Sequence, residues 1–475
     1  MLGRQFGVDA ASISVRAPHV GGGFGAKGMP RPNTTIAAMA ARWTGRPVSL
    51  AVTRQQMFAF TGYRTPTIQR VRLGADAGGR LVAIRHDAVS QSSRRNEFAE
   101  QTAVATRTMY TAPNMVTTHR LARLNVPSPS WMRAPGECPG MYALECAVDE
   151  LATATGVDPV ELRIRNEPER DPETGKAYSS RNLVACLREG ARRFGWDGRD
   201  PEPGARRDGR WQLGTGVASS MYPARLRPAS ATAERLPDGR WLVRINATDI
   251  GTGARTVLAQ LAVETLHVPV PSVVLEIGDS QLPAAGVAGG STGTSSWGTA
   301  VVRACEASLA NEGARSFVDT TDEASHRTDL AYYGFGAQFV EARVNVDSGE
   351  VRIPRMLGVF AVGRIVNPKT ARSQLVGGMT WGLSMALMEE SAIDHRTGMY
   401  VNHDLARYHV ATNADVGDVE AVWIDEHDPY VNPMGVKGIG EIGIVGAAAA
   451  VANAVWHATA TRVRDLPIRP DKLIG

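Results

Sequence analysis

Residues 432–446 read NPMGVKGIGEIGIVG and place one carboxylate, Glu441, among five glycines, directly before an Ala-rich segment with a helical pattern. Glycines let the backbone approach a ligand closely and adopt positive φ at little steric cost. The positive end of a helix dipole stabilises a nearby carboxylate in its ionised form, which a proton acceptor needs. The stretch therefore predicts a general base at Glu441, or a carboxylate that only complements the helix dipole.

The composition is that of a folded protein long enough for two or three domains. The chain has 475 residues, of which 43% are hydrophobic and 21% charged. Its 52 Lys and Arg nearly balance 48 Asp and Glu, and no basic tract is interleaved with aromatic residues, so nucleic-acid binding has little support. The cysteines are isolated, a spacing that favours neither a zinc site, an iron–sulfur cluster nor a disulfide framework: Cys138, Cys146, Cys186 and Cys305.

Two stretches bear on membranes and export. The most apolar one, 442–460, is interrupted by Asn453 and His457 and predicts a buried helix, not a membrane span. The first ten residues, MLGRQFGVDA, lack the charged and apolar regions of a signal peptide.

Three further glycine-rich loops each precede a helical pattern: 19–28 before 33–43, 248–253 before 254–266, and 286–296 before 297–310. A glycine loop that enters a helix presents backbone N–H groups to phosphate or oxo groups. The first loop fits neither a Walker A motif nor a dinucleotide fingerprint. A tight turn is the simpler interpretation of the first loop, and a flexible linker that of the last.

The remaining pattern predicts an α+β fold. Arg133 lies in a Pro- and Gly-rich loop over 133–140 that leads into a helix over 141–153, and another helix is expected over 374–387. Isolated strands are expected at 12–17 and at 48–54, and the helix at 33–43 is expected to start with an Asn-Thr-Thr cap. Other strands are expected at 214–220 and in hairpins over 71–89, 229–247 and 337–355. The Pro-, Gly- and charge-rich stretch 195–210 indicates a domain boundary.

Five motifs together resemble the molybdopterin-binding large subunit of the xanthine dehydrogenase and aldehyde oxidase family. They occur in the family's order and span nearly the whole chain: GGGFGAK at 21–27, MRAPGE at 132–137, DIGTG at 249–253, GGSTGTSS at 289–296 and GVKGIGE at 435–441. The MRAPGE form is most similar to bacterial three-subunit, periplasmic-type aldehyde oxidoreductases. The resemblance implies two α+β molybdenum-cofactor-binding domains, which we place at 1–195 and 211–475 with a linker at 196–210.

The resemblance also implies a site. Glu441 matches the catalytic base, and the molybdenum is held by the pterin and by no protein ligand. The implied cofactor-binding residues are Gly22, Gly23, Phe24, Gly25, Arg133, Ala134, Gly251, Thr252, Gly253, Gly289, Gly290, Ser291, Thr292, Lys437 and Gly438.

The family's chemistry gives further expectations. The cofactor would be molybdopterin, in its cytosine dinucleotide form, and water would be the oxygen source. Electrons would leave through iron–sulfur and FAD partner subunits. Gly28 and Pro135 stand where purine hydroxylases have a Glu and an aromatic residue, so the expected substrate is an aldehyde or another small N-heterocycle. The expected location is cytoplasmic, or periplasmic by co-export with a partner.

One departure leaves alternatives open. Family members carry a long segment before the GGGFG loop, whereas residues 1–20 precede it here, so the chain resembles the C-terminal cofactor-binding part. A truncated, non-catalytic remnant that pairs with partners but holds no cofactor is the second hypothesis. A generic nucleotide-binding protein is the third.

Overall fold

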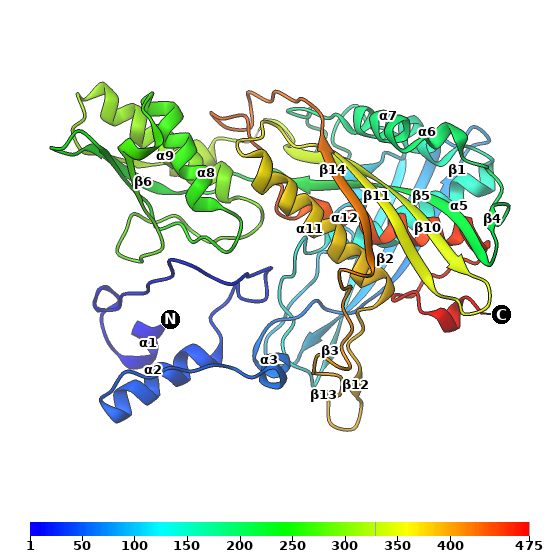
Figure 1. Cartoon of the computed structure of the whole chain (residues 1–475), viewed down its shortest axis with the longest axis horizontal. Helices are drawn as coiled ribbons and strands as arrows, with labels where there is room; N and C mark the ends of the chain where they lie inside the picture. The colour runs from blue at the N-terminus through cyan, green and yellow to red at the C-terminus, as the bar shows by residue number, and fades with distance from the viewer. Residues whose placement is uncertain (328, 475) are drawn as a thin grey trace.

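A five-stranded sheet organises the larger lobe of the computed structural model, which describes residues 1–327 and 329–474 (Figure 1). The strand order is β14-β11-β10-β5-β4. Three long strands pair antiparallel in its centre: β5 (Trp211–Pro223), β10 (Tyr333–Asn345) and β11 (Val351–Ala361). At the edges, β14 (Val416–Trp423) runs parallel to β11, and β4 (Arg207–Asp208) pairs antiparallel with β5.

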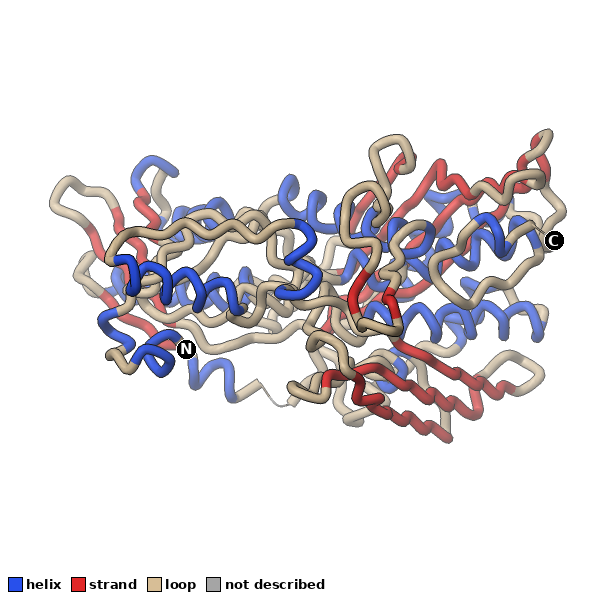
Figure 2. Tube along the Cα trace, turned by 90° about the horizontal axis from the view of Figure 1, so that it is seen from below, coloured by secondary structure: helices blue, strands red, loops and turns tan. Residues whose placement is uncertain are grey.

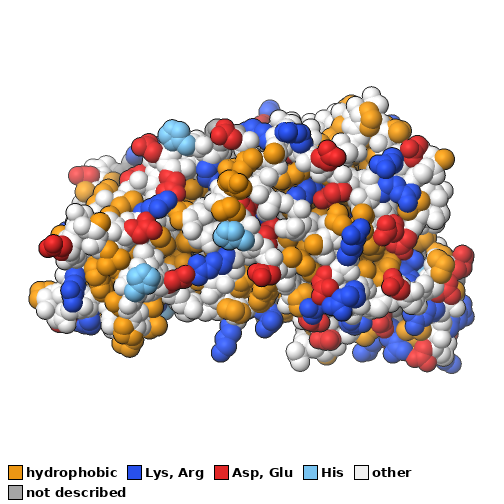
Figure 3. Space-filling model, turned by 90° about the horizontal axis from the view of Figure 1, so that it is seen from above, with side chains coloured by type: hydrophobic (Ala, Val, Ile, Leu, Met, Phe, Trp, Pro, Cys, Tyr) orange, Lys and Arg blue, Asp and Glu red, His pale blue; other side chains and the backbone are white. Residues whose placement is uncertain are grey.

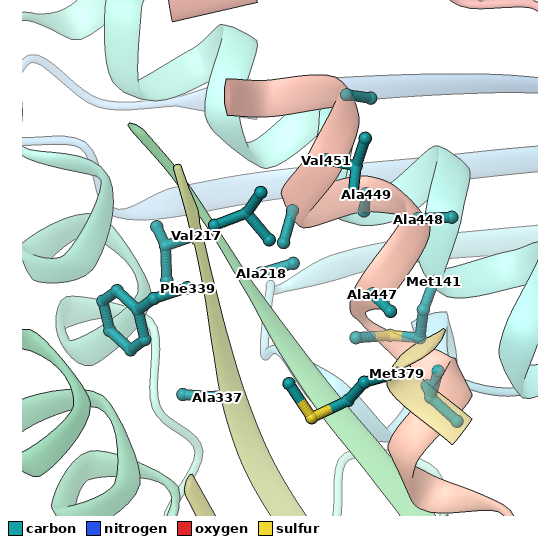
Figure 4. Close-up of a cluster of buried hydrophobic side chains, with 14 of the residues drawn as sticks. Met141, Val217, Ala218, Ala337, Phe339, Met379, Ala447, Ala448, Ala449 and Val451 are labelled. Carbon is teal, nitrogen blue, oxygen red and sulfur yellow. The ribbon is translucent and has the colours of Figure 1, made fainter. Parts of the chain in front are cut away.

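Helices cover both faces of this sheet. On one face lie α5 (Glu137–Thr155), α11 (Pro368–Leu387) and α13 (Ala447–Thr459), and on the other lies α7 (Leu183–Phe194). Figure 4 shows side chains of the strands packed with those of α5, α11 and α13, and Phe339 on the other side of the strands. The sheet is therefore buried on both faces, which makes this the main core.

Helix α13 lies directly on β5 because both elements carry very small side chains. A Cβ added to Gly214 or Gly216 would come within 2.2 or 2.3 Å of the α13 backbone. The described chain has one segment, Ile442–Thr459, with the length and mean hydropathy (1.4) of a membrane span, and 89% of it is buried inside the protein. This segment is therefore a core helix, as the sequence predicts.

A three-stranded sheet flanks the main core beside α5. It consists of β1 (Thr67–Ala75), β2 (Leu81–Ser93) and β3 (Asn114–Leu124), with β2 in the centre. Two short helices lie along the same part of the chain, α4 (Thr106–Met109) and α6 (Pro159–Arg165).

The smaller lobe, green in Figure 1, has its own core. Its four-stranded sheet has the order β8-β7-β6-β9, and α8 (Ala254–Leu266) and α9 (Gly293–Ala310) pack on it. The strands are β6 (Ser230–Arg235), β7 (Trp241–Arg244), β8 (Val273–Glu276) and β9 (Ser316–Asp319).

The N-terminal arm, blue in Figure 1, differs from both lobes. It contains α1 (Leu2–Phe6), α2 (Pro32–Thr44) and α3 (Arg54–Phe60), none of which has a buried residue. Backbone hydrogen bonds from Ala17 to Gly278 and from Val20 to Asp249 attach the arm to the smaller lobe.

The remaining elements are short. They are α10 (Thr321–Ser325), α12 (Ile442–Val445), β12 (Ile393–Asp394), β13 (Met399–Tyr400) and the 3-10 turns Ala10–Ser12, Trp196–Gly198, Val270–Ser272 and Pro470–Lys472. Figure 2 shows long loops, in tan, running between the strands at the two ends of the molecule. On the face in Figure 3, acidic and basic side chains are interspersed.

The three predicted hairpins are confirmed as β1–β2, β6–β7 and β10–β11, and the mixed fold class is confirmed as well. The isolated strands at 12–17 and 48–54 are wrong. The first forms a single bridge, Arg16 to Asp279, because no second strand lies beside it. The second leads into α3, where Thr53 and Gln56 form a capping box.

Four helix starts also differ from the prediction. Helix α11 begins at Pro368 and not at 374, since proline suits the first helical position. Helix α2 begins at Pro32 without any side-chain cap, since proline suits the first helical position. Helix α5 begins at Glu137 because Pro139 is tolerated in a first turn. Helix α9 begins at Gly293, so the expected loop 286–296 is shorter.

The predicted linker, 196–210, lies beside a shared core. Buried side chains from 81–196 and from 217–468 belong to one cluster. The domain boundary therefore stays a prediction.

Candidate active site

A cavity of about 1000 Å³ is lined by loops from both lobes and from the N-terminal arm. All the predicted site residues line it except Ala134 and Gly253, which lie just behind it. The lining members are Gly22, Gly23, Phe24, Gly25, Arg133, Gly251, Thr252, Gly289, Gly290, Ser291, Thr292, Lys437, Gly438 and Glu441. Loops that are hundreds of residues apart in the chain thus meet around one space.

Glu441 is the only acidic residue of this lining, and its carboxylate is held from two sides. Oε1 accepts a hydrogen bond from the backbone N–H of Ala134 at 3.0 Å, and Oε2 accepts one from the Ser291 hydroxyl at 2.7 Å. The residue precedes α12 as its N-cap, and its side chain makes no capping hydrogen bond. Its side chain is therefore directed to the cavity loops instead of capping the helix.

The backbone is strained at three places around the cavity. Phe24, Ala134 and Ser291 have φ values of 52°, 56° and 53°, which L side chains rarely adopt. Such a residue costs about 1–3 kcal/mol and persists only where its surroundings enforce it. The other described non-glycine residues with positive φ follow helix ends: His267, Glu312 and Ala460.

Arg133 ties the wall around Glu441 together. Its Nε donates to the carbonyl of Gly440 at 2.6 Å, and Nη2 donates to that of Gln374 at 2.7 Å. Its own N–H donates to the Phe24 carbonyl at 2.9 Å. Burial lowers the pKa of Arg133 to about 10, and the Glu441 charge partly offsets this, so the guanidinium stays charged at neutral pH.

Other predicted residues leave their backbone donors free. Within the described part of the chain, several N–H groups of the lining have no hydrogen-bond partner, among them those of Gly23, Phe24, Gly25, Thr252 and Gly290, and those of Ser291 and Gly438 beside Glu441. By contrast, the N–H groups of Gly251 and Gly253 both donate to Asp249 Oδ1, at 2.9 and 3.2 Å. The free groups form the part of the cavity best suited to an anionic ligand.

Lys437 reaches the cavity through its backbone alone. Its ammonium is buried with Glu426 and Asp428, at 3.1 and 3.3 Å, and also contacts the Ser180 hydroxyl. Burial opposes ionisation of Glu426, but Lys437 and Ser180 lower the pKa of that carboxyl. The lysine side chain therefore stabilises the fold beneath the loop and is not available to a ligand.

Gly438 has a packing role. A Cβ at this position would lie 2.1 Å from the Ser291 carbonyl oxygen. The loop over 438–441 and the loop over 289–292 are therefore in direct contact, which brings Ser291 to Glu441.

Two arginines and a tyrosine of the lining were not predicted. Arg225 and Arg227 follow β5 and line the cavity, and neither belongs to an ion pair shorter than 4 Å among the described residues. The buried Tyr222 hydroxyl lies close to the Glu441 carboxylate, although no hydrogen bond of ordinary geometry joins them. Burial, followed by the Glu441 charge, raises the pKa of Tyr222 well above its ordinary value, so it remains a donor. Tyr222 lies just beyond the predicted strand end at 220, and a polar aromatic residue at that place in the sequence is the signal that could have indicated its role.

Glu137, the last residue of the MRAPGE motif, is a second carboxyl close to Glu441. It is buried in the first turn of α5, and its Oε2 has no partner among the described residues. Burial raises the pKa of Glu137 to about 8; Arg225 opposes this shift, whereas Glu441 and Glu100 add to it. Glu137 is therefore largely protonated at neutral pH.

The described residues include no group of three or more His, Cys, Asp or Glu that could hold a metal ion.

Comparison with known families gives two matches, both described as a molybdopterin cofactor-binding domain. One covers residues 1–167, and the other covers 189–315 and 308–417. The chain is 40% identical to the aldehyde oxidoreductase molybdenum-binding subunit PaoC of Escherichia coli O157:H7, over all of this chain and 69% of that protein. It is 27% identical to the aldehyde oxidoreductase of Megalodesulfovibrio gigas, over all of this chain and 56% of that protein.

Solved structures have the same fold. The aldehyde oxidoreductase of Desulfovibrio gigas superposes with a TM-score of 0.86 at 24% identity, covering all of this chain and 56% of that one. The aldehyde oxidoreductase of Desulfovibrio desulfuricans superposes with a TM-score of 0.85 at 26% identity, covering 96% of this chain and 53% of that one. The chain thus spans about half the length of these solved proteins.

Proposed function

The chain belongs to the molybdopterin-binding subunits of the xanthine dehydrogenase and aldehyde oxidoreductase family, a group of molybdenum-dependent oxidoreductases, and from this premise we propose that it carries the catalytic site of a multi-subunit aldehyde oxidoreductase. The observation that carries the proposal is the cavity itself. It joins free backbone donors on one wall to a single, firmly held carboxylate on the other. An anionic cofactor and a proton acceptor require those two features side by side.

The cofactor proposed is molybdopterin in its cytosine dinucleotide form. Free N–H groups at Gly23, Phe24, Gly25, Thr252 and Gly290 would hold its oxo and phosphate oxygens. Arg225 and Arg227 line the same cavity without carboxylate partners among the described residues, which suits a ligand with several phosphates. When bound, the cofactor supplies the oxygen-transfer and two-electron chemistry that no side chain here provides.

Glu441 is the proposed general base. Oxidation of an aldehyde with water yields the acid, two electrons and two protons, so a group beside the reacting carbon must accept a proton. The two donors on Glu441 fix its carboxylate and leave lone pairs of both oxygens free for that proton. Arg133 holds the loop that ends at Gly440 and thereby keeps Glu441 in place.

The proposed substrate is a small aldehyde, with a small N-heterocycle as the alternative. Phe24, Trp131 and Met132 add apolar surface to the lining, and Phe24 packs edge-on against Trp381. Gly28 and Pro135, which line the same space, offer neither a charge nor an aromatic ring to a purine. An apolar, compact substrate fits these surroundings better than a polar bicyclic one.

The two electrons must leave the site. We propose partner subunits with iron–sulfur clusters and FAD as their route, in a cytoplasmic complex or in a periplasmic one that is exported with a partner. The four described cysteines are free and buried in this chain, which is consistent with clusters held elsewhere.

The experiment is an oxidation assay on the complex purified after co-expression with the neighbouring genes. Benzaldehyde, a short aliphatic aldehyde and a small N-heterocycle are tested with an artificial electron acceptor in ¹⁸O-labelled water. Since the aldehyde oxygen itself exchanges with water, two labelled oxygens in the carboxylic acid, or one in the hydroxylated heterocycle, support the proposal. Molybdenum-loaded protein that oxidises none of the three substrates would contradict it, and folded protein without molybdenum would favour the non-catalytic remnant.

A further inference from the structure

We propose that Ser291 is a positioning residue for Glu441 and that Oε2, the carboxylate oxygen facing Ser291, is the one that takes up the proton. The inference deepens the proposed function and rests on it. It also departs from the sequence analysis, in which Ser291 binds the cofactor.

The first argument is the direction of the two donors. The Ser291 hydroxyl donates to Oε2 at 2.7 Å, and the Ala134 N–H donates to Oε1 at 3.0 Å. The donors come from loops 150 and 307 residues away in the chain. Two donors on different oxygens fix both the position and the plane of the carboxylate. A hydroxyl engaged in this way is not free for a phosphate.

The second argument is the backbone that carries these donors. Ser291 and Ala134 both adopt left-handed φ values, 53° and 56°. Residues hold such a conformation when the surrounding structure enforces it, and they cluster at functional sites. Gly438 lets the chain pack directly against Ser291 in this conformation, since a Cβ at Gly438 would lie 2.1 Å from the Ser291 carbonyl oxygen. The loop that carries Glu441 thus packs against the strained residue that binds its carboxylate.

The third argument distinguishes the two oxygens. An amide N–H can only donate, so Oε1 must remain an acceptor to keep its contact with Ala134. A hydroxyl can both donate and accept. Once Oε2 carries a proton, the Ser291 hydroxyl can rotate and accept a hydrogen bond from it. The hydrogen bonds of Glu441 with Ala134 and with Ser291 are therefore both kept in either protonation state of the carboxyl when the proton is on Oε2.

Variants of Ser291 separate the hydroxyl from the backbone. Ser291→Ala removes the hydroxyl and keeps the strained backbone, whereas Ser291→Gly removes the hydroxyl and relieves the strain. Ser291→Cys keeps a weaker donor of similar shape. We expect kcat to fall about 10- to 100-fold in both Ser291→Ala and Ser291→Gly, which is the range for loss of a hydrogen bond to a charged group. The decrease in Ser291→Cys should be smaller. KM and molybdenum per chain should stay near wild type.

A second readout needs neither cofactor nor turnover. Melting temperatures are measured for Ser291→Ala, Glu441→Ala and the double variant. If the two side chains act as a pair, Ser291→Ala lowers Tm in the wild type but not in the Glu441→Ala background. Ser291→Gly should melt above Ser291→Ala, although its turnover is equally low.

The outcomes are distinct. Loss of molybdenum from Ser291→Ala with unchanged turnover per molybdenum would overturn the proposal and make Ser291 a cofactor ligand. Equal effects of Ser291→Ala on Tm in both backgrounds would overturn it as well. A wild-type complex without cofactor or turnover would refute the proposed function, whereas the Tm comparison would still decide whether Ser291 holds Glu441.

Discussion

The two walls of the cavity differ in whether their hydrogen-bond donors already have partners within the protein. On the wall formed by Arg133, Ala134 and the Glu441 carboxylate, the donors are already engaged: Arg133 with two carbonyls and the Ala134 N–H with Glu441. On the wall formed by 23–25, 252 and 290, backbone N–H groups have no partner within the described chain. The engaged wall is built to hold one of its own groups still, and the open wall is built to receive a ligand. Changes on the first should therefore alter turnover or stability, and changes on the second should alter occupancy.

The largest effect is expected at the centre of the engaged wall. Glu441→Gln removes the proton acceptor and should lower kcat by about 10²- to 10⁴-fold. Molybdenum content should stay near wild type, because the free donors are untouched. Steady-state kinetics with metal analysis of the same preparation check this. Turnover close to wild type would remove Glu441 from the mechanism.

Lys437 tests whether a residue beside the engaged wall acts through stability alone. Lys437→Met leaves Glu426 and Asp428 buried without their cation and should destabilise the protein by about 3–5 kcal/mol, as measured by urea unfolding. Lys369→Met is the matched control, since Lys369 is exposed, and it should change stability by less than about 0.5 kcal/mol. A stable Lys437→Met protein that lacks molybdenum would instead make this lysine a cofactor ligand.

Glu137, beside the engaged wall, makes the free energy of unfolding depend on pH. Its pKa is raised to about 8 in the folded chain from an ordinary 4.5, so the folded state holds a proton that the unfolded state releases in this window. Wild-type stability from this group is therefore highest below pH 4.5 and falls as the pH rises toward 8.

Glu137→Gln has no such proton to lose. It should match the wild type near pH 4.5 and exceed it by about 1–3 kcal/mol at pH 9, the range for a poorly solvated buried group. Urea melts at pH 5, 7 and 9 measure the difference. A difference that does not grow with pH would contradict the buried, proton-retaining Glu137.

The smallest effect is expected on the open wall. A Cβ at Gly23 would meet only the Ile250 side chain at 3.7 Å, an ordinary contact, so Gly23→Val should fold normally. It should nevertheless lower molybdenum content about tenfold, or about 1.4 kcal/mol, because the added side chain blocks approach to the backbone donors. Gly198→Val, at an open position outside the cavity lining, is the control. Full occupancy in Gly23→Val would show that this loop is only a turn.

The sequence predicted which loops matter but not what each group does there. Glycine spacing before helical patterns indicated the cavity loops at 21–25, 249–253 and 289–292, and these meet in the structure. It could not show that Asp249 engages Gly251 and Gly253, or that Lys437 turns inward. Both depend on side-chain directions set by tertiary contacts.

Missed strands and missed side chains have a related cause. Alternation at 12–17 and 48–54 predicted strands, but a strand needs a neighbouring strand to satisfy its backbone. The first segment pairs only with the short loop at 278–280, and no named strand pairs with the second. Tyr222 was missed because β5 continues beyond its apolar pattern to Pro223. Local pattern therefore identified the hairpins and the long helices other than α7, whereas the short helices, the pairing partners and the cavity-facing side chains required the fold.

The most direct test of the two-wall account is the molybdenum-to-protein ratio of three proteins prepared identically with their partner subunits: wild type, Glu441→Gln and Gly23→Val. The account predicts close to one molybdenum per chain in the first two and a strongly reduced ratio in the third. Equal ratios in all three would contradict the assignment of the open wall to the cofactor, and an empty wild type would contradict the cofactor site altogether.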